Sequence, residues 1–115
     1  SHSACYSIFP HPRNLTDSQI KSIASSGGIV GLNFYSRFLN GTNKAEIYDI
    51  IRHLKHLIKV GGESVAAIGT DFDGMECCLP IKTAADMPIL ADQLTREFGF
   101  LVAEKICFKN ALRLF

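Results

Sequence analysis

The sequence lacks the patterns that would assign it to several broad classes of protein. No apolar run among its 115 residues approaches the ~20 residues that a membrane-spanning helix needs. Lysine and arginine do not cluster, and the net charge is only +1, so nothing indicates a nucleic-acid surface. The four cysteines form no Cys-x-x-Cys pair, and we therefore expect ordinary reduced thiols in a reducing compartment. Internal repeats, linkers and low-complexity segments are also missing from the sequence.

The composition that remains is typical of a globular domain, with 47% hydrophobic and 20% charged residues. A chain of this length is enough for one modest domain but short for a large α/β enzyme. It begins at Ser1 rather than at a methionine, and we expect no signal peptide. We therefore expect residues 1–115 to form a single partial domain of a larger protein.

Helical and strand patterns alternate along the chain. They comprise a helix behind the capping box Thr16–Gln19, a strand at 29–35, a helix opening near 42–43 and ending at 61–62, a strand at 65–69, and two helices at about 89–97 and 101–114. Such alternation predicts parallel strands with right-handed helical crossovers. Because two strands do not make a stable sheet, we expect a third strand ending just before Ser1, and hence a fragment of a larger α/β sheet or barrel.

Polar residues follow the predicted strands where chemistry collects in parallel α/β folds. Asp71 and Asp73 follow the second strand, Asn33 and Tyr35 end the first, and His2 would lie just past the missing one. A histidine and carboxylates at one edge suit a zinc site, although His2 by itself also fits a frayed terminal residue.

Other residues carry weaker signals. Arg13 follows the stiff segment Pro10-His11-Pro12 and is either a carboxylate clamp or an ordinary solvated arginine. His53 and His56 lie three residues apart on a predicted helix, where they could share a metal, but we expect them to be solvated surface histidines. The segment Asp71–Gly74 does not match a calcium loop, because its glycine comes too early.

Five segments in register resemble the membrane (renal) dipeptidase family. They are Ser1-His2-Ser3, His11-Pro12-Arg13-Asn14-Leu15-Thr16-Asp17, Gly28-Ile29-Val30-Gly31-Leu32-Asn33-Phe34-Tyr35, Gly69-Thr70-Asp71-Phe72-Asp73-Gly74 and Asn110-Ala111-Leu112-Arg113-Leu114-Phe115. Any one of them is weak, but their order and spacing match over essentially the whole chain. The resemblance is to the C-terminal third of the family, about the last three βα units of a TIM-like (β/α)8 barrel of the amidohydrolase class.

The resemblance implies a zinc-dependent dipeptidase with two zinc ions in the complete active site. By resemblance, His2 is a zinc ligand, Arg13 holds the terminal carboxylate of the substrate, and Asp71 acts on the substrate amine or carries a proton. The family's other ligands, a His-x-Asp pair, a bridging glutamate and another histidine, come from earlier strands outside this chain. The isolated chain is therefore expected to be inactive, and a different divalent ion remains an alternative to zinc.

One departure concerns Phe38, which stands where the family can present a tyrosine to the pocket. The expected partners are a dipeptide, the remainder of the barrel and, since family members are often dimers, a second copy. Bacterial members without an anchor are the closer analogy and imply a cytoplasmic protein. Two other functions stay open, a noncatalytic barrel relative or binding module and another metal-dependent hydrolase such as a deaminase.

Overall fold

A computed structural model describes residues 2–33, 36–42, 46–69 and 87–112 of the chain. Its centre is a parallel sheet of three strands in the order β1-β2-β3, with β1 at His2–Ser3, β2 at Val30–Leu32 and β3 at Ala66–Ile68. The expected parallel pairing is confirmed. The expected position of the third strand is wrong, because this strand includes His2 and Ser3 rather than ending before Ser1.

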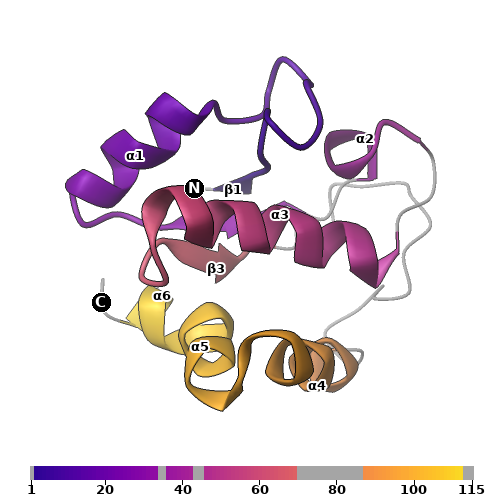
Figure 1. Ribbon diagram of the computed structural model, residues 1–115, viewed down its shortest axis with the longest axis vertical. Helices are drawn as coiled ribbons and strands as arrows, with labels where there is room; N and C mark the ends of the chain where they lie inside the picture. The colour runs from indigo at the N-terminus through magenta and orange to yellow at the C-terminus, as the bar shows by residue number, and fades with distance from the viewer. Residues whose placement is uncertain (1, 34–35, 43–45, 70–86, 113–115) are drawn as a thin grey trace.

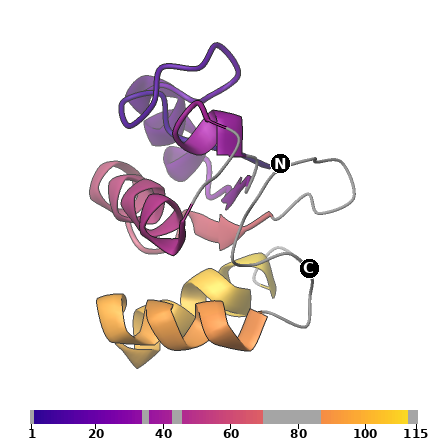
Figure 2. The same cartoon turned by 90° about the vertical axis from the view of Figure 1, so that its right-hand side faces the viewer.

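Helices connect and cover the strands. They are α1 (Asp17–Ser25), α2 (Ser36–Leu39), α3 (Ile47–Gly61), α4 (Met87–Phe98), α5 (Phe100–Glu104), the π-helical turn η3 (Lys105–Lys109) and α6 (Asn110–Leu112). Helices α1 and α3 lie side by side on one side of the strands (Figures 1 and 2). The yellow C-terminal segment packs against β3 through η3 and α6 (Figure 1). The mixed α/β class is therefore confirmed.

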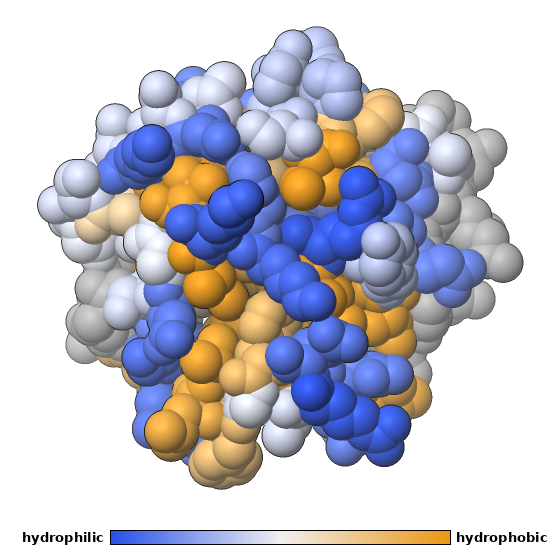
Figure 3. Space-filling view, viewed as in Figure 1, coloured by the Kyte–Doolittle hydropathy of each residue, from blue (hydrophilic) through white to orange (hydrophobic). Residues whose placement is uncertain are grey.

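The core lies between the sheet and these helices, because α3 and the C-terminal segment cover the strands while α1, α2 and α4 pack against α3. Its fully buried side chains include Ile20 of α1, Leu32 of β2, and Leu54 and Leu57 of α3. The opposite side of α3 is exposed, and Figure 3 shows hydrophilic residues lying along it with hydrophobic residues between them. No helix in the described segments combines the length and the apolar character needed to cross a bilayer.

The capping box predicted at the start of α1 is confirmed. The Gln19 N–H donates to Thr16 Oγ1 at 3.3 Å, and the Thr16 N–H donates to Gln19 Oε1 at 2.9 Å. These two bonds satisfy amide groups that a helix N-terminus leaves without partners inside the helix. The helix ends before Gly27, which takes a positive φ of 77°. The local sequence thus fixes both ends of α1.

The connection between β2 and α3 differs from the expectation. A four-residue helix, α2, follows β2, and α3 begins at Ile47 instead of near residue 42. The side chain of Asn40 explains part of this, because its Oδ1 accepts from the Thr42 N–H at 2.9 Å and forms a turn where a helix was expected. Helix α3 starts later, where Asp49 Oδ2 accepts from the Glu46 N–H at 2.9 Å.

Candidate active-site edge

The three parallel strands end at the same edge of the sheet. Backbone hydrogen bonds hold this edge together, from the Asn33 N–H to the Ser3 carbonyl at 2.7 Å and from the Gly69 N–H to the Leu32 carbonyl at 3.1 Å. Asn33 is buried there, with 3% of its surface exposed. Asp71 follows Gly69 by two positions in the sequence but lies outside the described residues, as do Asp73 and Tyr35.

His2 lies within β1, opposite Gly31 of β2, rather than beyond the end of a strand as expected. The structure describes its backbone and gives no account of its side chain. A neutral imidazole is a good zinc ligand, so the donor chemistry of this residue fits the expected metal. Within the described segments, no three His, Cys, Asp or Glu residues lie together as a metal site would require.

Arg13 lies in the segment that connects β1 to α1, and its side chain is exposed. Two hydrogen bonds hold this segment against the end of β1. Ser3 Oγ donates to the Arg13 carbonyl at 3.0 Å, and the Leu15 N–H donates to the Ala4 carbonyl at 2.8 Å. The chain therefore leaves β1, turns through Pro12, and brings Arg13 back beside the carboxyl end of that strand.

The ring of Phe38 supports this segment from α2. The guanidinium carbon of Arg13 lies 5.8 Å from the centroid of the Phe38 ring, within cation–π range. The His11 ring contacts the same ring, with centroids 4.6 Å apart. Asn14 adds polar contacts, because its Nδ2 donates to the Phe9 carbonyl at 2.9 Å and to the Phe38 carbonyl at 2.8 Å. The segments that follow β1 and β2 are thus packed against each other.

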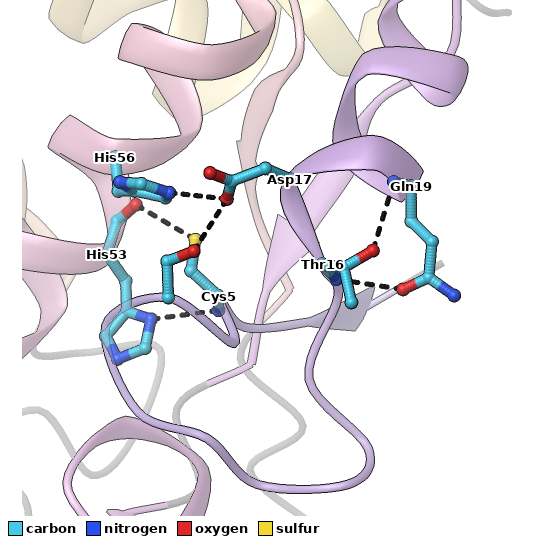
Figure 4. A network of polar contacts seen from close by, with 7 residues as sticks. Cys5, Thr16, Asp17, Gln19, His53 and His56 are labelled. Carbon is cyan, nitrogen blue, oxygen red and sulfur yellow. Dashed lines mark hydrogen bonds and ion pairs between the residues drawn. The ribbon is translucent and has the colours of Figure 1, made fainter.

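His53 of α3 lies beneath this junction and is fully buried. Its Nδ1 accepts from the Cys5 N–H at 3.0 Å (Figure 4), and its Nε2 lies 2.8 Å from the Leu39 carbonyl. Since a carbonyl only accepts, the proton must be on Nε2. Burial lowers the pKa of His53 to about 4, which keeps the ring neutral. The expectation of a solvated surface histidine is wrong for this residue.

His56 occupies the next turn of α3 and makes a separate contact. Its Nε2 lies 2.7 Å from Asp17 Oδ1 in the first turn of α1, and the same oxygen accepts from Ser7 Oγ at 2.9 Å (Figure 4). The hydrogen bond from His56, followed by that from Ser7, lowers the pKa of Asp17. His56 is only partly exposed and pairs with a carboxylate, and the described structure gives it no role at the strand ends.

The described cysteines are free thiols, as expected. Burial raises the pKa of Cys5 to about 12, so its thiol is neutral at physiological pH. Its Sγ donates to the His53 carbonyl at 3.5 Å. Cys77 and Cys78 lie outside the described residues.

Sequence reasoning missed the role of His53, although a signal was present. His53 lies three residues after Ile50 and four before Leu57, and the side chains of Ile50 and Leu57 are both buried. This spacing places the histidine inside the apolar stripe of α3 rather than beside it. Asn14 was missed as well, and no local pattern distinguishes it from an ordinary turn residue.

Comparison with known proteins gives consistent matches over the whole chain. The sequence model of the family described as membrane dipeptidase, peptidase family M19, matches residues 1–115. A Klebsiella pneumoniae protein, described as an uncharacterized protein in the pqqA 5′ region, is 38% identical over an alignment 120 positions long, which covers 99% of this chain and 44% of that protein.

Two solved structures agree with the fold. A dipeptidase AC, described as a metallopeptidase of family M19, gives a TM-score of 0.91 at 33% identity and covers 98% of this chain. A metallopeptidase from Rhodobacter sphaeroides, liganded with a phosphinate mimic of the dipeptide L-Ala-D-Ala, gives a TM-score of 0.87 at 34% identity over 98% of this chain. The chain spans 35% and 34% of the lengths of these two structures.

Proposed function

The chain belongs to the membrane dipeptidase family, peptidase family M19, and from this premise we propose that it is the C-terminal part of a metal-dependent dipeptidase. In this proposal, residues 1–115 supply about the last three βα units of a TIM-like barrel. The parallel order β1-β2-β3 supports it, because consecutive strands of such a barrel are parallel neighbours. The remainder of the barrel would supply the other strands and most of the substrate pocket.

The observation that carries the proposal is the return of Arg13 to the carboxyl end of β1. Active sites of barrel enzymes lie at this end of the strands. An exposed guanidinium there is suited to bind a carboxylate through paired, charge-assisted hydrogen bonds. We assign to Arg13 the role of binding the terminal carboxylate of a dipeptide. Phe38 supports the guanidinium from below and has no hydroxyl to add a second contact to that carboxylate.

His2 and Asp71 complete the contribution of this chain. His2 would donate an imidazole nitrogen to zinc, with the remaining ligands coming from the rest of the barrel. Zinc, when bound, lowers the pKa of its coordinated water to near 7 and polarises the peptide carbonyl. Asp71 would hold the substrate amine or accept a proton during cleavage. An acid and an arginine at opposite ends of the cleft would select a two-residue zwitterion.

The experiment is hydrolysis of L-Ala-D-Ala by the full-length enzyme in the presence of zinc. This dipeptide is chosen because the Rhodobacter sphaeroides relative was solved with its phosphinate mimic. Arg13→Ala should lower kcat/KM by about 10- to 100-fold, mainly through KM, because it removes about 1.5–3 kcal/mol of charged hydrogen bonding. Arg96→Ala is the matched control, since Arg96 is also exposed and pairs only with Asp92 of its own helix among the contacts described.

Two results would count against the proposal. Absence of hydrolysis by the zinc-loaded wild type, tested with a panel of dipeptides, would favour a noncatalytic relative. Hydrolysis with a KM that Arg13→Ala leaves unchanged would remove Arg13 from the substrate site.

A further inference from the structure

The buried imidazole of His53 connects three separate parts of the fold. It belongs to α3, yet one ring nitrogen bonds the backbone just after β1 and the other bonds the last residue of α2. These two backbone groups, the Cys5 N–H and the Leu39 carbonyl, belong to the two segments that lead away from neighbouring strand ends. The imidazole is therefore a rigid spacer between them, since its two nitrogens are at a fixed separation.

Two buried backbone groups need a hydrogen-bonding side chain at this position. The carbonyl of Leu39 closes the short helix α2, whose last carbonyls have no partners within the helix. The Cys5 N–H lies where β1 has ended and its strand pairing has stopped. Both groups are buried, and buried backbone groups need hydrogen-bond partners. An apolar side chain of the same size would fill the space but leave both groups unpaired.

The two segments that His53 joins are the ones that meet above it. Arg13 and His11 come from the segment after Cys5, and both contact the ring of Phe38, the residue before Leu39. A shift of Cys5 relative to Leu39 would therefore change the position of Arg13 over Phe38. A second polar connection between the same segments is the bond from Asn14 Nδ2 to the Phe38 carbonyl at 2.8 Å.

We propose that His53 is a positioning residue for substrate binding, which acts by fixing the segment that carries Arg13 against α2. The proposal rests on the proposed function, because it takes Arg13 as the carboxylate-binding group. His53 touches neither substrate nor metal in this role. Its neutral state agrees with the geometry, since a proton on Nδ1 would point at the Cys5 N–H.

Two substitutions of His53, each of which keeps one of its two hydrogen bonds, test these bonds separately. In His53→Asn, the amide oxygen takes the place of Nδ1 and retains the acceptor for the Cys5 N–H. In His53→Gln, the longer amide reaches the place of Nε2 and retains the donor to the Leu39 carbonyl. Leu54→Ala is the matched control, because Leu54 is the next residue of α3 and is equally buried but makes no polar contact.

The measurement is KM and kcat of the full-length enzyme with L-Ala-D-Ala and zinc. We expect each His53 variant to raise KM about tenfold, since small displacements of a binding group cost this much or more. Leu54→Ala should lower the active fraction, and with it kcat, at an unchanged KM. In an Arg13→Ala background, the His53 substitutions should raise KM no further, because their effect passes through Arg13. An unchanged KM in both His53 variants would overturn the proposal. So would a further tenfold rise in KM when the His53 substitutions are made in the Arg13→Ala background.

A second measurement does not depend on turnover. Crystal structures of the wild type and of His53→Asn give the distance from the Arg13 guanidinium to the Phe38 ring directly. We expect this distance to increase by about 1 Å or more in the variant. An unchanged distance would contradict the positioning role. An inactive wild type in which the distance still changes would reject the proposed function while supporting the role of His53 in the fold.

Discussion

Asn110, near the end of the described chain, donates from its side-chain nitrogen to the Ala66 carbonyl of β3 at 2.7 Å. The same nitrogen donates to the Glu63 carbonyl at 2.7 Å. One amide group, 3% exposed, thus ties α6 to the beginning of β3. The C-terminal helices are therefore held to the sheet by polar bonds as well as by apolar packing.

Asn110→Ala should destabilise the chain by roughly 2–4 kcal/mol, because it leaves two buried carbonyls without a donor. Asn110→Asp should cost about as much, since a carboxylate keeps the shape but has no N–H to donate. Urea unfolding followed by circular dichroism measures both. Lys105→Ala is the control, because it removes only the exposed ion pair to Glu63 and should cost less than about 1 kcal/mol.

The second prediction concerns how the buried His53 makes the folding stability depend on pH. Its pKa is about 4 in the folded chain against about 6.5 when unfolded. Below pH 6.5 the unfolded state takes up a proton that the folded state does not, so stability falls as the pH decreases and this loss ends near pH 4. The loss attributable to His53 should reach about 3 kcal/mol.

The comparison that isolates this contribution is wild type against His53→Gln, unfolded in urea at intervals from pH 7.5 to 4. Asp17 titrates in both proteins, so its contribution cancels in the difference. The stability advantage of the wild type should shrink as the pH falls. A difference that stays constant with pH would mean that the imidazole is not buried in neutral form.

Alanine substitutions at Gly41 and Gly62, which both have a positive φ, distinguish the energetic cost of backbone strain from that of steric overlap. A Cβ on Gly41 would lie 2.3 Å from Cζ of Phe9, whereas a Cβ on Gly62 would meet nothing within 4 Å. Gly62→Ala should therefore cost about 1–3 kcal/mol from its backbone conformation alone, because a positive φ with an extended ψ is nearly restricted to glycine. Gly41→Ala should cost more, and Phe9→Leu in the same chain should recover part of the excess. Equal melting temperatures for the two alanine variants would argue against the packing of Phe9 on this turn.

Asp71→Asn addresses the residue assigned to the substrate amine or to proton transfer. In the full-length enzyme with zinc, we expect kcat for L-Ala-D-Ala to fall by about 10²- to 10⁴-fold, as is typical when a general acid–base group is lost. Asp92→Asn replaces an exposed carboxylate on α4 and should leave kcat unchanged. Normal turnover of Asp71→Asn would exclude the catalytic role.

The 115-residue chain by itself should neither hold two zinc ions nor hydrolyse dipeptides, because His2 is the one ligand assigned to it. Metal analysis after dialysis against zinc, together with an L-Ala-D-Ala assay, tests this expectation. Two tightly bound zinc ions per chain would contradict the assignment of the remaining ligands to the rest of the barrel.

Several features of the fold were predictable because their causes lie within a few residues of one another. Thr16 and Gln19 are three positions apart, and their capping box follows from that spacing alone. The apolar run around Val30 predicts a strand covered on both faces, since parallel strands carry helices over them. The position of Arg13 in a constrained segment was likewise visible, although its return to Ser3 was not.

Tertiary structure decided what the sequence pattern left open. Cys5 and His53 are 48 positions apart, and no local rule connects them. Whether a histidine within an apolar stripe is buried as a hydrogen-bonding group depends on which backbone groups reach it after the chain has closed on itself. The sequence by itself determined the alternation of parallel strands with helices and the residue types that follow the strands. Only the folded chain determined which backbone groups meet the imidazole, because hydrogen bonds between distant segments form once their elements have packed.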